Sequence, residues 1–449
     1  MSSKNTSIAI LGAGISGLAV AYYLIKSGLE VTVYEKENSA GGVIRTHRDS
    51  NWLVEDGPNT MLVGEQQIWD LIDDLNLTNN VIRPGNEAKK RFIARDGKLC
   101  AAPTSITDFF KTDLLSTSAK FRLLKEPFIP ASKKKDESIA GFIRRRLGNE
   151  PLEYAVNPFV SGIYAGDPGE LSVKHTFTSL FEMEQTHGSI TKGFFKRDKN
   201  SKTRRALISF DEGLQSLPNA LQSELSDAVR FNSTIEQISG DAVGWSVQLK
   251  SGEVKNHNTL ISTIPAHQLP AIWSDAKSNQ SIQQLSNIVY APMSVLALGF
   301  RRNQITHPLD GFGMLIPEVE PFSLLGCLFS SSLFPKRAPD GHVLLTCFLG
   351  GARHRALAAI PTQDLTAETL PQLDQLLDVE GQPTFIHHRY WPKAIPQYAV
   401  GYDRFLETMK QIEDDNPGLY LAGNYRGGVS VPDCILNGFE MAEKVTQYL

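Results

Sequence analysis

Short apolar runs separated by glycine-rich turns begin close to the start of the chain. Residues 8–11 are apolar, a second largely apolar stretch covers 15–26, and apolar and polar side chains alternate over 30–34. A transmembrane helix needs about 20 consecutive apolar residues, and here glycine and serine interrupt the run. The pattern therefore predicts a strand at 8–11, a helix at 15–26 and a second strand at 30–34.

Three glycines lie between the first strand and the helix, in the order GxGxxG. Gly12 allows a tight turn, Gly14 lets a pyrophosphate approach the backbone, and Gly17 brings the helix close to the strand. The free N–H groups at the start of the helix attract phosphate. Glu35, at the end of the second strand, is placed to accept hydrogen bonds from a ribose. We predict a dinucleotide site, with a glycine-rich helix packed on a sheet as the alternative.

Further patterns divide the rest of the chain. A turn at Asp96–Gly97 between alternating stretches predicts a hairpin. Helix-like spacing dominates from about residue 103 to residue 205, and strand patterns return over 205–265 and 285–350. A last strand leads through a glycine-rich turn into a helix from Pro432. We therefore expect a nucleotide-binding domain built from separated pieces, with other domains inserted.

The composition narrows the class of protein. The chain has 45 Lys and Arg against 49 Asp and Glu, a near balance that argues against nucleic-acid binding. Its four cysteines are widely spaced, so we expect no zinc site, no disulfide framework and a reducing compartment. We predict no signal peptide and no membrane span. The expected location is the cytoplasmic side, with the protein soluble or bound to a membrane surface.

One stretch, residues 192–205, carries seven basic residues and one acidic residue. A solvated loop is the simpler interpretation. In the alternative interpretation the stretch contacts anionic lipid head groups, and Phe194 and Phe195 enter the interface.

The residues after Glu35 decide between NAD and FAD. The sequence "EKENSAGGVIRT" resembles the extended fingerprint of the FAD-dependent amine-oxidase-like superfamily. Three more restrictive motifs resemble the protoporphyrinogen oxidase family, most closely its oxygen-dependent plant mitochondrial type: "VSGIYAGDP", "FEMEQTHGSI" and "SSSLFPKRAP". This resemblance runs almost from end to end of the chain.

The resemblance implies a mixed α/β fold. A Rossmann-like FAD-binding domain of the p-hydroxybenzoate-hydroxylase topology would carry an inserted mixed-sheet substrate domain and a helical membrane-binding domain. Residues 1–86, 206–268 and 386–449 would form the FAD-binding domain. Residues 87–102 and 269–385 would form the substrate domain, and 103–205 the helical domain.

The resemblance also implies a set of FAD contacts. A buried core position is the alternative for Ile235 and Val431. The full set is Gly12, Ala13, Gly14, Ile15, Ser16, Gly17, Glu35, Lys36, Gly42, Val43, Arg45, Gly57, Pro58, Asn59, Thr60, Ile235, Trp391, Gly423, Val429, Ser430 and Val431.

The implied substrate contacts combine apolar walls with one or two cationic anchors, as a flat macrocycle with carboxylate tails requires. An arginine would pair with a propionate, Arg95 by the best register and Arg91 by the alternative register. Sheet core is the other interpretation of the apolar positions. Ser161–Gly162 departs from the paired glycines of the plant pattern, so we expect a cavity of slightly different shape. The implied set is Arg95, Gly166, Leu315, Leu328 and Phe348.

The function implied by the resemblance is oxidation of protoporphyrinogen IX, with FAD taking a hydride and molecular oxygen forming hydrogen peroxide. We predict no catalytic side chain or general base, because the histidines are scattered. The alternatives are oxidation of coproporphyrinogen III, another FAD-dependent amine oxidase or desaturase, and a flavin-free binding protein like the Rab GDP-dissociation inhibitors. The oligomeric state stays open, with a homodimer among the options.

Overall fold

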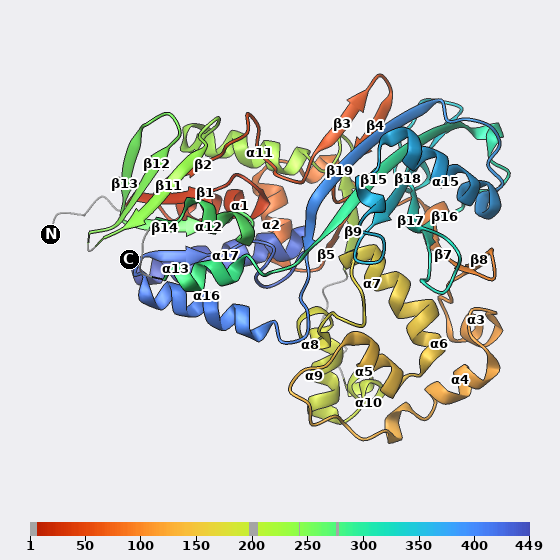
Figure 1. Ribbon diagram of the computed structural model, residues 1–449. Helices are drawn as coiled ribbons and strands as arrows, with labels where there is room; N and C mark the ends of the chain where they lie inside the picture. Colours follow the sequence, from red (N-terminus) through yellow and green to blue (C-terminus); the bar gives the residue numbers. More distant parts are fainter. Residues whose placement is uncertain (1–6, 197–204, 242, 275–277) are drawn as a thin grey trace.

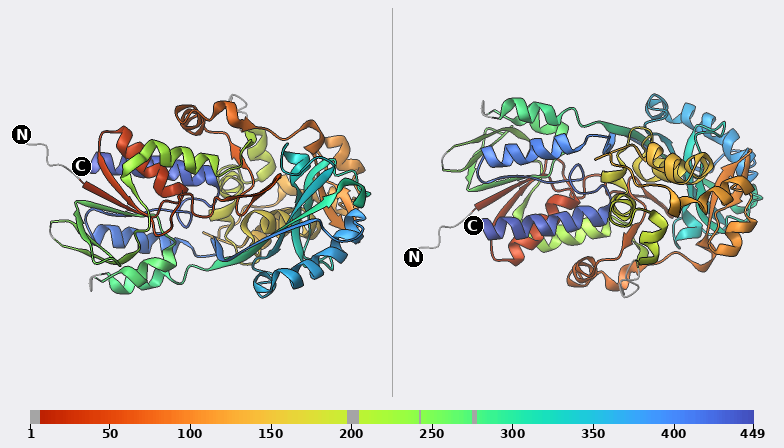
Figure 2. Two further views of the ribbon diagram at one scale, coloured as in Figure 1. Left: turned by 90° about the horizontal axis from the view of Figure 1, so that it is seen from above. Right: turned by 90° about the horizontal axis from the view of Figure 1, so that it is seen from below.

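The computed structural model describes residues 7–196, 205–241, 243–274 and 278–449, which form three regions. A parallel sheet with its helices lies at one end of the molecule and a long mixed sheet at the other (Figure 1). A group of helices lies beside the mixed sheet. Two long strands, β15 and β19, run between the two ends, and Figure 2 shows the same arrangement from above and below.

The parallel sheet has the strand order β10-β2-β1-β14-β20. Strands β1 and β2 come from the start of the chain, and β10, β14 and β20 come from segments much further along it. The sheet is therefore assembled from separated pieces, as expected. The predicted strand, helix and strand at 8–34 are confirmed. The bounds are β1 Ser7–Leu11, α1 Ile15–Lys26, β2 Glu30–Tyr34, β10 Val229–Arg230, β14 Thr259–Ser262 and β20 Leu419–Leu421.

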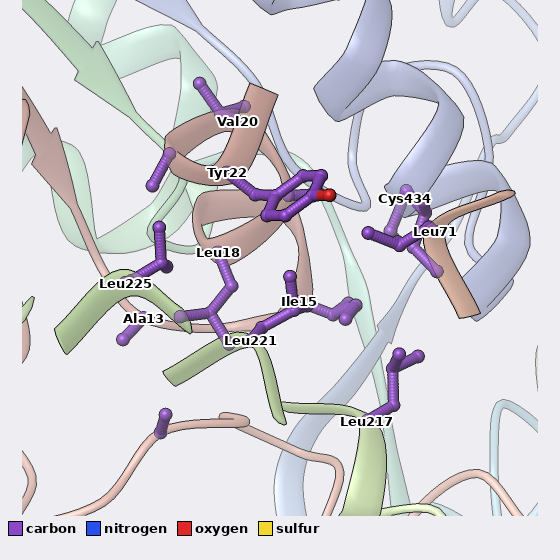
Figure 3. Close-up of a cluster of buried hydrophobic side chains, with 14 of the residues drawn as sticks. Ala13, Ile15, Leu18, Val20, Tyr22, Leu71, Leu217, Leu221, Leu225 and Cys434 are labelled. Atoms are coloured by element: carbon purple, nitrogen blue, oxygen red, sulfur yellow. The ribbon is translucent and has the colours of Figure 1, made fainter. Parts of the chain in front are cut away.

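Helix α1 is buried against the sheet between two other helices, and Figure 3 shows part of this core. Leu18 of α1 lies in one cluster with Leu221 of α11 and Cys434 of α17. A Cβ on Gly438 of α17 would come within 2.7 Å of the Ala19 Cβ, so only glycine allows this helix crossing. The bounds are α2 Gln66–Asp74, α11 Ser216–Leu225, α16 Asp403–Asp415 and α17 Val431–Tyr448.

Several small elements lie around the parallel sheet, and one of them, the β3–β4 hairpin, packs on the mixed sheet. The strand patterns predicted over 205–265 are confirmed, and they include an antiparallel sheet β11-β12-β13. The bounds are β3 Thr46–Asp49, β4 Trp52–Glu55, β5 Met61–Val63, β6 Val81–Ile82, β9 Ala206–Phe210, β11 Ile235–Gly240, β12 Trp245–Leu249, β13 Val254–His257, α12 Leu269–Ile272 and α13 Asn279–Leu285.

The mixed sheet has the order β19-β15-β18-β17-β16-β7-β8. The predicted hairpin is confirmed, and Asp96 and Gly97 both have the positive φ angles, 51° and 72°, that a tight hairpin turn requires. The bounds are β7 Lys90–Arg95, β8 Lys98–Ala101, β15 Tyr290–Arg301, β16 Gly311–Leu315, β17 Leu324–Phe329, β18 His342–Gly350 and β19 Phe385–Pro396.

The two faces of the mixed sheet have different environments. One face packs on α15 (Thr362–Leu377), and its side chains, such as Met314, Cys327 and Leu345, are fully buried. The opposite face carries Leu315, Leu328 and Phe348, which are only half-buried. This second face is therefore the one available to a ligand.

The helical pattern predicted from residue 103 is confirmed for the described residues, and Arg146 and Glu126 form a fully buried ion pair there at 2.6 Å. Residues 197–204 of the basic stretch lie outside the described residues. Within the described ranges, every helix is too short or too polar to cross a bilayer. The bounds are α3 Ile106–Lys111, α4 Thr117–Leu123, α5 Ile139–Arg146, α6 Asn149–Pro151, α7 Asn157–Tyr164, α8 Val173–Thr176, α9 Thr178–His187 and α10 Ile190–Lys196. The short helix α14 Ser330–Leu333 lies outside this region, between β17 and β18 of the mixed sheet.

We propose to keep the three-domain division with one boundary moved. Strand β19 pairs with β15 along most of its length, so it belongs to the mixed sheet by hydrogen bonding. The range 386–449, assigned to the FAD-binding domain from the sequence, would then start after Pro396.

Candidate active site

The glycine turn leaves open space at the start of α1. A Cβ on Gly17 would lie 2.0 Å from the Gly12 carbonyl oxygen, so Gly17 is required for the close approach of helix and strand. At Gly14, the residue that precedes α1, a Cβ would meet no atom within 4 Å. Because the helix N-terminus attracts phosphate, this cradle suits a pyrophosphate. Ala13, Ile15 and Ser16 complete the turn and are buried.

Glu35 is held beside this turn. Its Oε2 accepts a hydrogen bond from the Ala13 N–H at 2.7 Å, and its Oε1 accepts one from the Glu37 N–H at 2.9 Å. A carboxylate has about four acceptor positions, so two remain for ribose hydroxyls. The next residue, Lys36, is exposed.

A second loop, residues 41–45, is stacked on the turn. A Cβ on Gly42 would lie 3.3 Å from the Gly14 Cα, and a Cβ on Gly57 would lie 2.2 Å from the Val43 carbonyl oxygen. Arg45 donates from Nε to the Gly42 carbonyl at 3.0 Å, so it holds its own loop. The predicted residues from three segments therefore meet at one place. Val43 keeps 42% of its surface exposed despite this packing.

The loop that follows β4 is fixed by strand β19. Trp391 donates from its indole N–H to the Asp56 carbonyl at 2.6 Å, and His387 Nε2 lies 2.6 Å from Asp56 Oδ1. His47 stacks on the His387 ring with 3.9 Å between centroids. These contacts position the Gly57–Thr60 segment, in which Asn59 Nδ2 donates to the Gly57 carbonyl at 3.0 Å. Sequence reasoning missed Asp56 and His387, although His387 and Trp391 share one side of an alternating stretch.

The predicted C-terminal FAD contacts lie in two places, one near the Gly12 turn and the other at the start of α17. Gly423 has a φ of 126°, and a Cβ there would lie 3.4 Å from the Thr263 carbonyl, close to the Gly12 turn. Ser430 caps α17 and is exposed. Val431 is buried in the core around α1, and Val429 packs against the neighbouring cluster.

Ile235 lies at the start of β11, half-buried against the aromatic core below the parallel sheet. Lys36 and Lys393 both lie close enough to His267 to affect its pKa, and sequence reasoning missed Lys393. Burial, together with the charges of Lys393 and Lys36, lowers the pKa of His267 to about 4. His267 therefore stays neutral at physiological pH, and the two lysines supply the positive charge.

The apolar substrate residues meet on one face of the mixed sheet. Leu315 pairs with Gly326, and Gly326 pairs with Phe348, so Leu315 and Phe348 lie in one row across three strands. Leu328 lies in the adjacent row. Directly opposed residues share a face of a sheet, so the three side chains form a continuous apolar floor. Their partial exposure favours a ligand surface over sheet core.

Helix α7 lies against this floor. A Cβ on Gly162 would lie 2.7 Å from Leu315 Cδ2, so glycine is needed at that contact. Its neighbour Ser161 is buried, donates from Oγ to the Asn157 carbonyl at 2.9 Å and accepts a hydrogen bond from Arg353. The serine that departs from the plant pattern is thus bound by polar partners of its own.

Gly166 has a packing role in the structure. A Cβ there would lie 2.5 Å from Leu171 Cδ1 and 2.6 Å from Gln397 Oε1. This tight contact explains why glycine is needed. A direct substrate contact by Gly166 stays a prediction.

The two candidate arginines differ in their partners. Arg91 and Arg95 flank Ile93 on β7, and Ile93 pairs with Leu315, so both lie on the face of the floor. Arg95 Nη1 lies 3.7 Å from a Glu150 carboxylate oxygen and also donates to the Leu114 carbonyl. Arg91 is exposed, and its guanidinium lies 5.3 Å from the centre of the Phe312 ring.

Comparisons with known proteins agree with this arrangement. A model of the flavin containing amine oxidoreductase family matches residues 15–446. The chain belongs to this family. Mitochondrial protoporphyrinogen oxidase of Nicotiana tabacum is 35% identical over 100% of the chain and 96% of that protein. Protoporphyrinogen oxidase 2 of Arabidopsis thaliana is 37% identical over 98% of the chain and 94% of that protein.

Two bacterial proteins extend the comparison with this amine oxidoreductase. Coproporphyrinogen III oxidase of Bacillus subtilis (strain 168) is 28% identical over 100% of both chains. The crystal structure of an Exiguobacterium sp. 255-15 protein, provisionally named a protoporphyrinogen oxidase, has a TM-score of 0.84 and 25% identity, with 100% of both chains covered. The mixed α/β flavoprotein fold is therefore confirmed.

The cofactor of this flavin-containing amine oxidoreductase is FAD, and the residues present fit it. The open cradle at Gly14 accepts a pyrophosphate, and the free lone pairs of Glu35 accept a ribose. A flavin-free binding protein would have no need of either feature. The individual FAD contacts stay predictions. Within the described residues, no cluster of side chains could hold a metal ion.

Proposed function

We propose that the protein oxidises protoporphyrinogen IX to protoporphyrin IX, with FAD as the first electron acceptor. Molecular oxygen would be the second acceptor, and hydrogen peroxide would be released. The observation that carries this proposal is the apolar floor of Leu315, Leu328 and Phe348. Arg91 and Arg95 lie at one end of this floor, and Trp391 lies on the same face of the sheet. The related protoporphyrinogen oxidases support the choice of substrate.

The side chains would bind and orient the substrate rather than transfer protons. Leu315 and Phe348 would contact the pyrrole rings and exclude water. The Asp56 contacts with Trp391 and His387 would keep the Gly57–Thr60 loop in place beside the flavin. When bound, FAD supplies the capacity to accept a hydride from the saturated bridge carbon.

We propose that Arg91, the residue indicated by the alternative register, is the propionate anchor in place of Arg95. An arginine that is already paired with a carboxylate has less positive charge to offer a second anion, and Arg95 has Glu150 close by. Among the side chains that the structure describes, which do not include those of residues 86 and 87, Arg91 has no ion-pair partner within 4 Å. Arg91→Met should raise the KM for protoporphyrinogen about tenfold, the usual loss for one charged hydrogen bond. Arg95→Met should change KM much less.

We also propose peripheral contact with anionic lipid, on the cytoplasmic side and without insertion. The described helical region exposes Phe121, Phe128 and Phe195, with 63%, 86% and 79% of their surfaces accessible. Exposed lysines at 133–135 lie in the same region. Sedimentation with vesicles of anionic and neutral lipid tests the contact. A homodimer is part of the proposal and is tested by analytical ultracentrifugation.

Porphyrin fluorescence in air tests the main proposal. The purified, FAD-containing protein is mixed with protoporphyrinogen IX and, separately, with coproporphyrinogen III. Faster porphyrin formation from protoporphyrinogen IX than in the protein-free control is the expected result. A protein that binds FAD and accelerates neither reaction would refute the proposal while leaving the flavoprotein fold intact.

A further inference from the structure

The apolar floor belongs to a longer row that crosses six strands. Phe348 pairs with Val295 on β15, and Val295 pairs with Arg389 on β19. At the other end, Leu315 pairs with Ile93 on β7. Neighbouring strands lie about 4.8 Å apart, so the backbone at Arg389 and the backbone at Ile93 are roughly 24 Å from each other. One apolar row thus has an arginine at one end and Arg91 beside the other.

Arg389 has no anionic partner in the described part of the chain. Its guanidinium lies 4.3 Å from the centre of the Trp391 ring, and no carboxylate there lies within 4 Å of it. Its Nε is buried and makes no hydrogen bond. A buried donor without a partner costs free energy, so the side chain is suited to an anion that the protein itself does not supply.

We propose that Arg389 is a second carboxylate anchor, which gives the site affinity for porphyrinogens with carboxylates on both edges. This inference rests on the proposed function. Protoporphyrinogen carries two propionates and coproporphyrinogen carries two more. A site for protoporphyrinogen needs cations at one end of the floor only. The cation at the opposite end matches a tetracarboxylate, so coproporphyrinogen III is the second substrate.

The test compares three variants with the wild type on both porphyrinogens. Arg389→Met removes the charge, and Arg389→Lys keeps a charge without the planar fork. Arg404→Met is the matched control, because exposed Arg404 stacks at 4.7 Å on Phe405 in α16. KM and kcat come from porphyrin fluorescence in air, and the midpoint potential of the bound flavin is measured by dye-coupled reduction.

We expect the wild type to oxidise both substrates. Arg389→Met should raise the KM for coproporphyrinogen about tenfold or more and the KM for protoporphyrinogen less than about twofold. Its kcat and flavin potential should stay unchanged, and Arg389→Lys should recover part of the affinity. Arg404→Met should behave as the wild type.

Three results would overturn the inference. If KM for both substrates changes equally, or for neither, while the wild type stays active, Arg389 is not a carboxylate anchor and the proposed function stands. If kcat falls and the flavin potential shifts, Arg389 acts on the cofactor instead. If the wild type oxidises neither porphyrinogen, the proposed function fails, and this inference fails with it.

Discussion

Two glycines with nearly the same backbone conformation allow a controlled test of the FAD site. Gly14 has φ −69° and ψ 171°, Gly85 has φ −60° and ψ 162°, and each precedes a helical turn. A Cβ at Gly14 would meet nothing within 4 Å, and a Cβ at Gly85 would come no closer than 3.9 Å to another atom. Neither alanine should disturb the protein without its cofactor.

We therefore expect Gly14→Ala to weaken FAD binding at least tenfold, because the methyl group would occupy the place of the pyrophosphate. Gly85→Ala should bind FAD as the wild type does. Fluorescence titration of the FAD-free proteins measures both affinities, and thermal unfolding shows whether each variant is folded. Equal FAD affinity for all three proteins would place the pyrophosphate elsewhere.

A buried carboxyl group near the Gly57–Thr60 loop should make stability depend on pH. Glu55 is 3% exposed, and burial raises its pKa to about 7 despite nearby Arg337 and a hydrogen bond from the Leu214 N–H. A raised pKa in the folded state means that its contribution to stability is fully present below the unfolded pKa. That contribution is lost as the pH rises towards 7.

We expect the wild type to lose on the order of 3 kcal/mol relative to Glu55→Gln between about pH 4.5 and pH 7. The glutamine variant cannot ionise, so its own unfolding should lack this dependence. Thermal midpoints of both proteins at several pH values measure the difference. Parallel pH curves would show that Glu55 keeps the same charge in the folded and unfolded states.

At the scale of elements, the apolar patterns predicted where most strands and helices lie in the sequence, because each element carries its own periodicity. The start of α1, the Asp96–Gly97 turn and the final helix all lie where the sequence placed them. Sheet order could not be predicted in the same way. Pairings such as β7 with β16 join residues about 220 positions apart, and nothing in either stretch specifies the other.

The helical region contains a buried ion cluster that ties its elements together. Glu126 pairs with Arg146 of α5 at 2.6 Å, accepts a hydrogen bond from Ser189 Oγ at 2.6 Å and accepts one from the Ile190 N–H at the start of α10. Removing one partner of a buried pair typically costs about 3 kcal/mol or more, and here the cost is lower because Arg146 keeps buried Glu184 at 3.3 Å. Glutamine at position 126 should therefore destabilise this region.

We expect Glu126→Gln to lower the thermal midpoint by several degrees and to leave FAD affinity unchanged. Glu182→Gln on α9 is the matched control, because Glu182 is exposed. Circular dichroism measures the unfolding, and flavin fluorescence measures the cofactor. An unchanged midpoint would show that the cluster contributes little net stability.

At the scale of the whole molecule, the sequence allowed more of the FAD site than of the substrate site to be predicted. The glycine turn and Glu35 are close in sequence, so their spacing alone specifies their geometry. The substrate floor depends on register across several strands, and the partners of Arg91 and Arg95 depend on how the helical region docks. Asp56 was missed for the same reason, since its partner His387 is distant in the chain.

The helical region is joined to the nucleotide-binding region through Asp403 of α16. Lys174 Nζ lies 2.6 Å and His175 Nε2 3.1 Å from its carboxylate oxygens. The hydrogen bond from Lys174 keeps the pKa of Asp403 below its usual value. This ion pair therefore stabilises the docked arrangement above the unfolded pKa of Asp403 and is lost as the pH falls through the folded pKa.

We expect Asp403→Asn to loosen the helical region without loss of FAD. A partly exposed pair contributes up to about 1 kcal/mol, so tryptic cleavage within 106–196 should accelerate by up to about fivefold at neutral pH. Asp74→Asn, which breaks the exposed Lys26–Asp74 pair, is the control and should leave cleavage there unchanged. Mass spectrometry locates the cuts, and flavin absorbance reports the cofactor. If Asp403→Asn and the wild type are cut at the same rate, packing of α8 on α16 rather than charge holds the two regions together.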